Sequence, residues 1–406
     1  MIAAGRIPSP LPLLLALVPA LALAPSACGS GEDESAASAT TGAEASSGTS
    51  EATDTAAADP TGETAATTGT TSDGTATSAG TTSDGTTTST GTTSDATTTS
   101  AGTTSTSGDD TTTTGGGLEI YDPDQDGPWS VLNLKGVAKA GGVDVPIDCY
   151  YPSDGPEPGP YPVVIVAHGF QLPASQYTSY VKRLASHGYV AVNADFQAGL
   201  FNPDHVAYAK QILAGVDWVA AQPGLDGIAD PDNVGLTGHS LGGKISVLGA
   251  VMDPRVRASI TLDPVDSSVM CDPQKCPDVS MMLPIDVPLG FVGETLDGMG
   301  GFMPCAPAAD NFLTFYQAAA APALAVTVLG ANHMSFLDDV ASCGVTCSFC
   351  QQASLDNATV NALSRAFVVA FYGRHLKGIA GYDTYLTGAE AQARYVDEGL
   401  VTIQSK

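Results

Sequence analysis

Apolar residues between positions 118 and 406 form short strand-like runs that alternate with longer helical stretches. Residues 163–167 (VVIVA) and 189–193 (YVAVN) are short aliphatic runs of the kind found in strands that are buried on both faces of a sheet. Residues 175–187 have the pattern of an amphipathic helix, which Gly188 closes, and residues 203–221 are also predicted to be helical.

The same alternation continues through the rest of this region. Further strands are expected at residues 131–139, 143–151, 234–237, 258–262, 289–292 and 324–329, and further helices at 243–252 and 355–376. The first two of these strands are expected to form a hairpin around Gly141 and Gly142. Strands that alternate with helices predict an α/β fold, with a mostly parallel central sheet flanked by helices in a single domain.

The composition changes sharply before this region. Residues 29–117 contain no aromatic residue and no Leu, Ile, Val, Lys or Arg, and consist almost entirely of Thr, Ser, Ala, Gly, Asp and Glu. Such a segment cannot bury enough apolar surface to offset the entropy lost on ordering it. We therefore expect a disordered linker at 29–117 and one catalytic domain at 118–406.

The N-terminus has the features of an export signal. Arg6 supplies a positive charge, and residues 11–24 are apolar but too short and too rich in proline to favour a spanning helix. Ser26 and Ala27 precede Cys28 as small residues do in a bacterial lipobox, although Pro25 stands where an aliphatic residue is usual. Residues 1–28 are thus expected to be a signal peptide that ends at a lipidated Cys28, with plain secretion as the alternative.

Export permits disulfides among the seven remaining cysteines. Two groups are close in sequence, Cys271 with Cys276, and a second group of Cys343, Cys347 and Cys350. The second group resembles a zinc knuckle, but no distant ligand pair has the spacing of a zinc site, so disulfides are expected. The odd count leaves one thiol unpaired.

The net charge of the chain is −28. Within residues 118–406, 30 acidic and 14 basic residues give a net charge of −16. This charge repels phosphate backbones and anionic membranes, so we expect no nucleic-acid partner and no membrane contact beyond the N-terminal lipid anchor. The oligomeric state is not determined by the sequence.

Residues 238–243 (GHSLGG) contain a G-x-S-x-G pattern between a predicted strand and a predicted helix. In this setting a tight turn lifts a serine hydroxyl above the sheet, and side chains two residues before and after the serine would collide. Ser240 is therefore the predicted nucleophile. A serine hydroxyl is a weak nucleophile at neutral pH and needs a base within hydrogen-bonding reach.

The base is predicted from the positions of the six histidines. His333 alone follows a late aliphatic strand on a short loop, near the end of the domain, as the chain order Ser, acid, His requires. The acid should follow a strand between Ser240 and His333. Asp263 and Asp297 both meet this condition, Asp266 is a weaker third, and periodicity does not separate them.

Residues 162 to about 350 resemble the chlorophyllase family of α/β-hydrolases. The matching segments are PVVIVAHGF, SHGY, GHSLGGK, LDPVD, PCAP, NHMSFLDD and the cysteines near Cys343. In chlorophyllases the first Asp of DPVD is the acid, which favours Asp263. Platelet-activating-factor acetylhydrolases are similar in this respect, whereas cutinase-like polyester hydrolases use an Asp after the next strand, which would be Asp297. Leu241 stands where chlorophyllases usually carry Arg.

The resemblance also implies an oxyanion hole made by the backbone N–H groups of Phe170 and Leu241. Residues 122–127 (DPDQDG) look like the start of a calcium loop, but Asn133 replaces the final Glu, so we interpret them as an acidic turn. The predicted function is an exported esterase that acts on small or lipid-like esters through a Ser-His-Asp triad without a cofactor. The alternative is a catalytically inactive binding module tethered to the cell envelope.

Overall fold

The computed structural model describes residues 119–199, 201–267, 271–299 and 304–406. The predicted signal peptide, Cys28 and the predicted linker lie outside these residues. No helix in the described ranges is long and apolar enough to cross a membrane.

The described chain folds around one nine-stranded sheet in the order β1-β2-β4-β3-β5-β6-β7-β8-β9. Strands β3 to β8 are parallel, whereas β1 with β2, β2 with β4, and β8 with β9 pair antiparallel. The strands are β1 (Val131–Ala140), β2 (Val143–Pro152), β3 (Tyr161–Ala167), β4 (Val190–Ala194), β5 (Ala229–Gly238), β6 (Val256–Leu262), β7 (Leu289–Glu294), β8 (Ala323–Val328) and β9 (Val401–Ser405). The expected α/β fold, with its hairpin and mostly parallel sheet, is confirmed.

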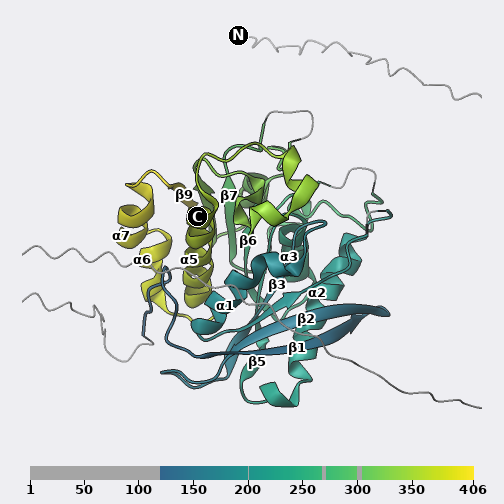
Figure 1. Cartoon of the computed structure of the whole chain (residues 1–406), viewed down its shortest axis with the longest axis vertical. Helices are drawn as coiled ribbons and strands as arrows, with labels where there is room; N and C mark the ends of the chain where they lie inside the picture. Colours follow the sequence, from purple (N-terminus) through teal and green to yellow (C-terminus); the bar gives the residue numbers. More distant parts are fainter. Residues whose placement is uncertain (1–118, 200, 268–270, 300–303) are drawn as a thin grey trace, which may run out of the picture. The chain divides into compact units, whose positions relative to one another are not determined.

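Helices cover both faces of the sheet (Figure 1). The main helices are α1 (Thr178–Ser186), α2 (His205–Ala220), α3 (Leu241–Met252), α4 (Phe312–Ala318) and α5 (Asn357–His375). Alternate residues of β3 belong to two separate cores: Val163 and Ile165 pack with residues of α2 and α3, whereas Val164 and Val166 pack with residues of α1 and α5. A strand that is apolar at every position is thus explained by a helix layer on each side.

The elements that follow α5 were not predicted from the sequence. After α5 the chain adds the short helices α6 (Asp383–Leu386) and α7 (Ala389–Ala391), a π-helical turn (Gln392–Val396), and β9, which closes the sheet beside β8. Residues of β9 are largely exposed after Val401, so the strand lacks the apolar run that identified the buried strands. The short helix α4 was also missed, and the expected helix at 175–187 begins as a 3-10 turn at Ala174–Tyr177.

Candidate active site

Ser240 lies at the sharp turn between β5 and α3, with backbone φ 56° and ψ −120°. The turn leaves no room for side chains at the flanking glycines. A Cβ at Gly238 would lie 2.3 Å from the backbone of Gly242, and a Cβ at Gly242 would lie 2.3 Å from the backbone oxygen of Ala167. The two glycines therefore allow a conformation that lifts the Ser240 side chain off the end of the strand.

His333 begins the 3-10 turn η4 (His333–Phe336), five residues after β8, and its ring reaches two other predicted site residues. Its Nε2 lies 2.8 Å from Ser240 Oγ, and its Nδ1 lies 2.6 Å from Asp263 Oδ2. The side chains of His333 and Asp263 are almost completely buried. These three residues come from the ends of different parallel strands and meet at the carboxyl edge of the sheet, where α/β folds place their sites.

The two candidate acids contact different parts of His333. Asp263 follows β6 and accepts a hydrogen bond from the ring. Asp297 follows β7, and its Oδ2 accepts from the backbone N–H of His333 at 2.8 Å while its Oδ1 accepts from the backbone N–H of Gln351 at 2.7 Å. Asp297 thus ties two loops together through their main chains. Asp266, the weaker third option, instead forms an ion pair with buried Lys244 at 3.1 Å.

Glu294 is a further buried carboxyl group near Asp263 and Asp297, and the sequence pattern did not identify it. It ends β7, and its Oε2 accepts hydrogen bonds from the backbone N–H groups of Leu296 and Asp297. Burial, followed by the nearby charge of Asp263, raises the pKa of Glu294 to about 8. Its only sequence signal is its place in GETLD, directly after the apolar run of β7.

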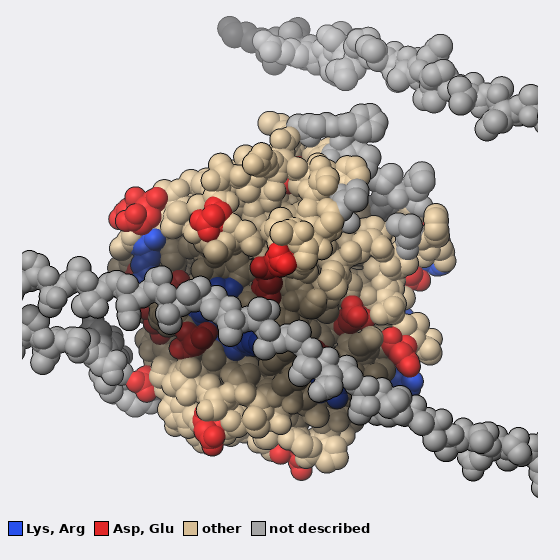
Figure 2. Space-filling view, viewed as in Figure 1, with Lys and Arg blue, Asp and Glu red and all other residues tan. Residues whose placement is uncertain are grey.

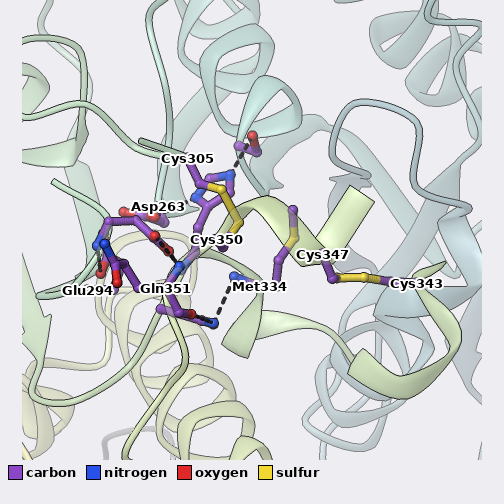
Figure 3. Close-up of a disulfide and its surroundings, with 12 residues drawn as sticks. Asp263, Glu294, Cys305, Met334, Cys343, Cys347, Cys350 and Gln351 are labelled. Atoms are coloured by element: carbon purple, nitrogen blue, oxygen red, sulfur yellow. Dashed lines mark hydrogen bonds and ion pairs between the residues drawn. A yellow bond between two sulfur atoms is a disulfide. The ribbon is translucent and has the colours of Figure 1, made fainter. Parts of the chain in front are cut away.

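Burial also raises the pKa of Asp263, and the hydrogen bond from His333 opposes that rise. Figure 3 shows Asp263 and Glu294 on the same side of the Cys305–Cys350 disulfide. A carboxylate oxygen of Asp297 and the two sulfur atoms of this disulfide all lie within 4.8 Å of one another. Asp297, which accepts a hydrogen bond from the His333 backbone, therefore lies next to this disulfide.

The two backbone N–H groups that are predicted to form the oxyanion hole belong to Phe170 and Leu241. Phe170 follows β3 by three residues, and Leu241 is the first residue of α3. Within the described ranges, neither amide donates a hydrogen bond to another residue. A free amide in the first turn of a helix is suited to bind an anionic oxygen. The Phe170 side chain is 37% exposed.

The expected disulfides are present. They join Cys271 to Cys276, Cys305 to Cys350, and Cys343 to Cys347. Cys149 is the free thiol among the described residues, and burial raises its pKa to about 12, which makes it a poor nucleophile.

The three aspartates of the acidic turn at residues 122–127 form ion pairs with two arginines of this chain. Arg394 Nη1 contacts the carboxylates of Asp122 and Asp124 at 2.9 and 2.8 Å, and Arg183 forms an ion pair with Asp126 at 2.9 Å. These contacts join the start of the domain to α1 and to the π-helical turn at Gln392–Val396.

This chain is similar in sequence to a known protein family and to several known hydrolases. The family model described as Chlorophyllase matches residues 146–390. The bis(hydroxyethyl) terephthalate hydrolase of Streptomyces coelicolor is 31% identical over 142 residues, which are 34% of this chain and 44% of that protein. Chlorophyllase-1 of Arabidopsis thaliana is 30% identical over 197 residues, which are 45% of this chain and 60% of that protein.

A cutinase is also similar. Cutinase 2 of Thermobifida cellulosilytica is 28% identical over 117 residues, which are 28% of this chain and 43% of that protein. The matched part of this chain therefore spans less than two thirds of the length of each of these three relatives.

Proposed function

This chain belongs to the chlorophyllase family of α/β-hydrolases, and from that premise we propose that it is an exported serine hydrolase that cleaves carboxylic esters. The observation that carries the proposal is the chain of contacts from Ser240 Oγ through the His333 ring to Asp263, at 2.8 and 2.6 Å. Distances of this size allow a proton to move between nucleophile and base. The alternative, an inactive binding module, would not require this alignment.

In the proposed reaction, His333 Nε2 takes the Ser240 proton as Oγ attacks the ester carbonyl carbon. Asp263 accepts from Nδ1, holds the ring in the required tautomer and stabilises the imidazolium that forms. The negative oxygen of the tetrahedral intermediate is held by the N–H groups of Phe170 and Leu241. His333 then returns the proton to the departing alcohol, and water resolves the acyl-enzyme by the same steps.

The proposed substrates are uncharged or lipid-like esters. Acidic side chains are spread over the face of the molecule shown in Figure 2. The net charge of −16 for residues 118–406, from 30 acidic and 14 basic residues, disfavours the approach of anions. Hydrolysis of a neutral p-nitrophenyl ester should therefore depend less on ionic strength than hydrolysis of an ester with a carboxylate in its acyl chain. An equal dependence would contradict this preference.

Ser240→Ala tests the reaction directly. Wild-type protein should hydrolyse p-nitrophenyl butyrate and take up one equivalent of a phosphonate probe, measured by intact mass. The variant should lose both properties while it keeps the wild-type far-ultraviolet circular dichroism spectrum. A folded wild-type protein that neither hydrolyses the ester nor takes up the probe would favour the inactive binding module instead.

We also propose that residues 1–28 direct export, that Cys28 carries a lipid, and that residues 29–117 tether the catalytic domain. The support is the sequence pattern alone. Cys28→Ala should move the protein from the cell envelope to the medium in a fractionation experiment. Retention of the variant in the envelope would argue against a lipid anchor at this position.

A further inference from the structure

A line of buried hydrogen bonds connects the loop after β3 to His333 without passing through Ser240. The backbone N–H of Gly169 donates to Tyr177 Oη at 3.2 Å. Tyr177 Oη lies 2.8 Å from His239 Nδ1, and His239 Nε2 lies 2.7 Å from the backbone oxygen of His333. Tyr177 and His239 are both completely buried. The contacts thus join the residue before Phe170 to the main chain of the proposed base.

One arrangement of protons satisfies every atom of this line. The His333 carbonyl oxygen can only accept, so His239 must carry its proton on Nε2. Nδ1 of a neutral ring then accepts, and the Tyr177 hydroxyl donates to it. The Tyr177 oxygen is left to accept from Gly169. A doubly protonated His239 would leave the Tyr177 hydrogen without this acceptor, and burial, followed by the nearby His333, lowers the pKa of His239 well below its usual value.

The contact with His239 completes a set of four that hold His333. Asp297 accepts from its backbone N–H, His239 donates to its carbonyl, Asp263 accepts from Nδ1 and Ser240 contacts Nε2. The two main-chain contacts fix the position of the His333 backbone, and the two ring contacts fix the orientation of the imidazole ring. Rotation of the ring alone could not compensate for a shift of the main chain.

We propose that Tyr177 and His239 are positioning residues, which hold the oxyanion loop at Gly169 and the His333 main chain in one fixed geometry. This inference rests on the proposed ester hydrolysis. Acyl transfer requires the oxyanion donors and the base to be correctly placed at the same moment, and a misplacement of about 1 Å can cost about 100-fold in rate. A rigid link between the two parts would preserve both distances together.

Tyr177→Phe removes the link and leaves the proposed catalytic residues in place. Tyr372→Phe is the matched control, because Tyr372 is also completely buried and its hydroxyl makes one side-chain hydrogen bond, to Thr237 Oγ1 at 2.7 Å. Both variants should stay folded, and Tyr177→Phe should lose more thermal stability because it also leaves the Gly169 N–H without its partner. Tyr177→Phe should lower kcat for p-nitrophenyl butyrate at least about tenfold with KM within about threefold of wild type, and Tyr372→Phe should change kcat less than about twofold.

The positioning role is overturned if the two variants have the same kcat, or if Tyr177→Phe changes KM alone. A second measurement does not depend on activity. In full-length protein with ¹⁵N-labelled histidine, the His239 resonances, assigned from a His239→Asn variant, should show the neutral Nε2–H tautomer at pH 7. An Nδ1–H tautomer or a charged His239 ring would overturn the proposed line of hydrogen bonds even if the enzyme is active. If the wild-type protein shows no hydrolysis that depends on Ser240, that result contradicts only the proposed function.

Discussion

At the scale of single residues, the main feature is that two buried aspartates hold one histidine in different ways. Asp263 contacts the His333 ring at Nδ1, whereas Asp297 accepts from the His333 backbone N–H and joins it to Gln351. A ring contact stabilises the imidazolium that forms during proton transfer, and a main-chain contact places the residue. The two carboxylates should therefore differ in their effect on rate.

The first prediction compares Asp263→Asn with Asp297→Asn. Asp263→Asn should lower kcat on the order of 10³- to 10⁴-fold, because an amide neither offsets the imidazolium charge nor fixes the reactive tautomer. Asp297→Asn should lower kcat only about 10- to 100-fold, because its side chain still accepts one of the two backbone hydrogen bonds. Steady-state rates on p-nitrophenyl butyrate measure both. The reverse order would assign the acid to Asp297.

The second prediction concerns the dependence of stability on pH. The pKa of buried Glu294 is raised to about 8 from a usual 4.5, so the folded protein holds this proton more tightly than the unfolded chain. Its stabilising contribution is complete below about pH 4.5 and is lost as the pH rises through about 8. This single group lowers the free energy of unfolding by up to about 1.4 kcal/mol for each pH unit in that interval.

Glu294→Gln should flatten this part of the stability profile, as measured by urea unfolding at intervals from pH 5 to pH 8.5. The control is Glu398→Gln, because Glu398 is exposed. That variant should keep the wild-type slope. If the free energy of unfolding of the wild type rises from pH 5 to pH 8, and Glu294→Gln shows the same dependence on pH, then Glu294 is ionised in the folded protein.

At the scale of elements, the junction of β5 and α3 depends on close backbone contacts. A Cβ on Gly242 would lie 2.3 Å from the Ala167 oxygen and 2.4 Å from the His168 oxygen, and neither backbone can retreat because β3 is buried within the sheet. Gly215 in α2 offers a contrast, since a Cβ there would come no closer than 3.4 Å, to Ile165 Cδ1. Equivalent substitutions at these two glycines should therefore have opposite effects.

Gly242→Ala is the third prediction. It should lower the free energy of unfolding by about 3 kcal/mol or more and abolish hydrolysis, because α3 must move away from β3 and take the Leu241 N–H with it. Gly215→Ala should keep full activity and gain up to about 1 kcal/mol from the better helix propensity of alanine. Urea unfolding and ester hydrolysis of both variants are the measurements. An active, stable Gly242→Ala protein would contradict the tight turn.

At the scale of the whole catalytic domain, a disulfide joins loops that are far apart in sequence. Cys305–Cys350 connects the loop after β7 to the segment after β8 and spans 45 residues, whereas Cys271–Cys276 spans only 5. His333 and Asp297 lie on the two loops that the longer disulfide connects, and Asp297 also binds the backbone of Gln351, next to Cys350. A covalent link between these loops supports the noncovalent contacts that place His333.

The fourth prediction compares the loss of these two disulfides. Cys305→Ser/Cys350→Ser should lower the free energy of unfolding by about 2 to 4 kcal/mol and lower kcat, because a long closed loop restricts the unfolded chain most and because its ends hold His333. Cys271→Ser/Cys276→Ser should cost less stability, since its loop is short. Equal losses of stability in the two double variants would contradict this ranking. Guanidinium unfolding under non-reducing conditions measures the stability.

The sequence by itself determined the α/β fold and the positions of most strands. Buried strands such as β3 and β4 are apolar along their length, so a local pattern identifies them. The glycines around Ser240 and the loop position of His333 are also local signals, and the structure places these two side chains 2.8 Å apart. These features could be predicted because neighbouring residues alone encode them.

The local pattern left Asp263 and Asp297 open because both follow apolar strands, and the family resemblance only favoured Asp263. The tertiary structure decided that Asp263 is the one that reaches the His333 ring. The tertiary structure also decided the Cys305–Cys350 pairing, the pairing of β9 with β8, and the hydrogen bonds from Tyr177 through His239 to His333. Each of these contacts joins residues that are distant in sequence, and its existence depends on how strands and loops pack. A local sequence pattern indicates which residues form a strand, helix or turn, whereas packing of these elements decides which distant side chains contact one another.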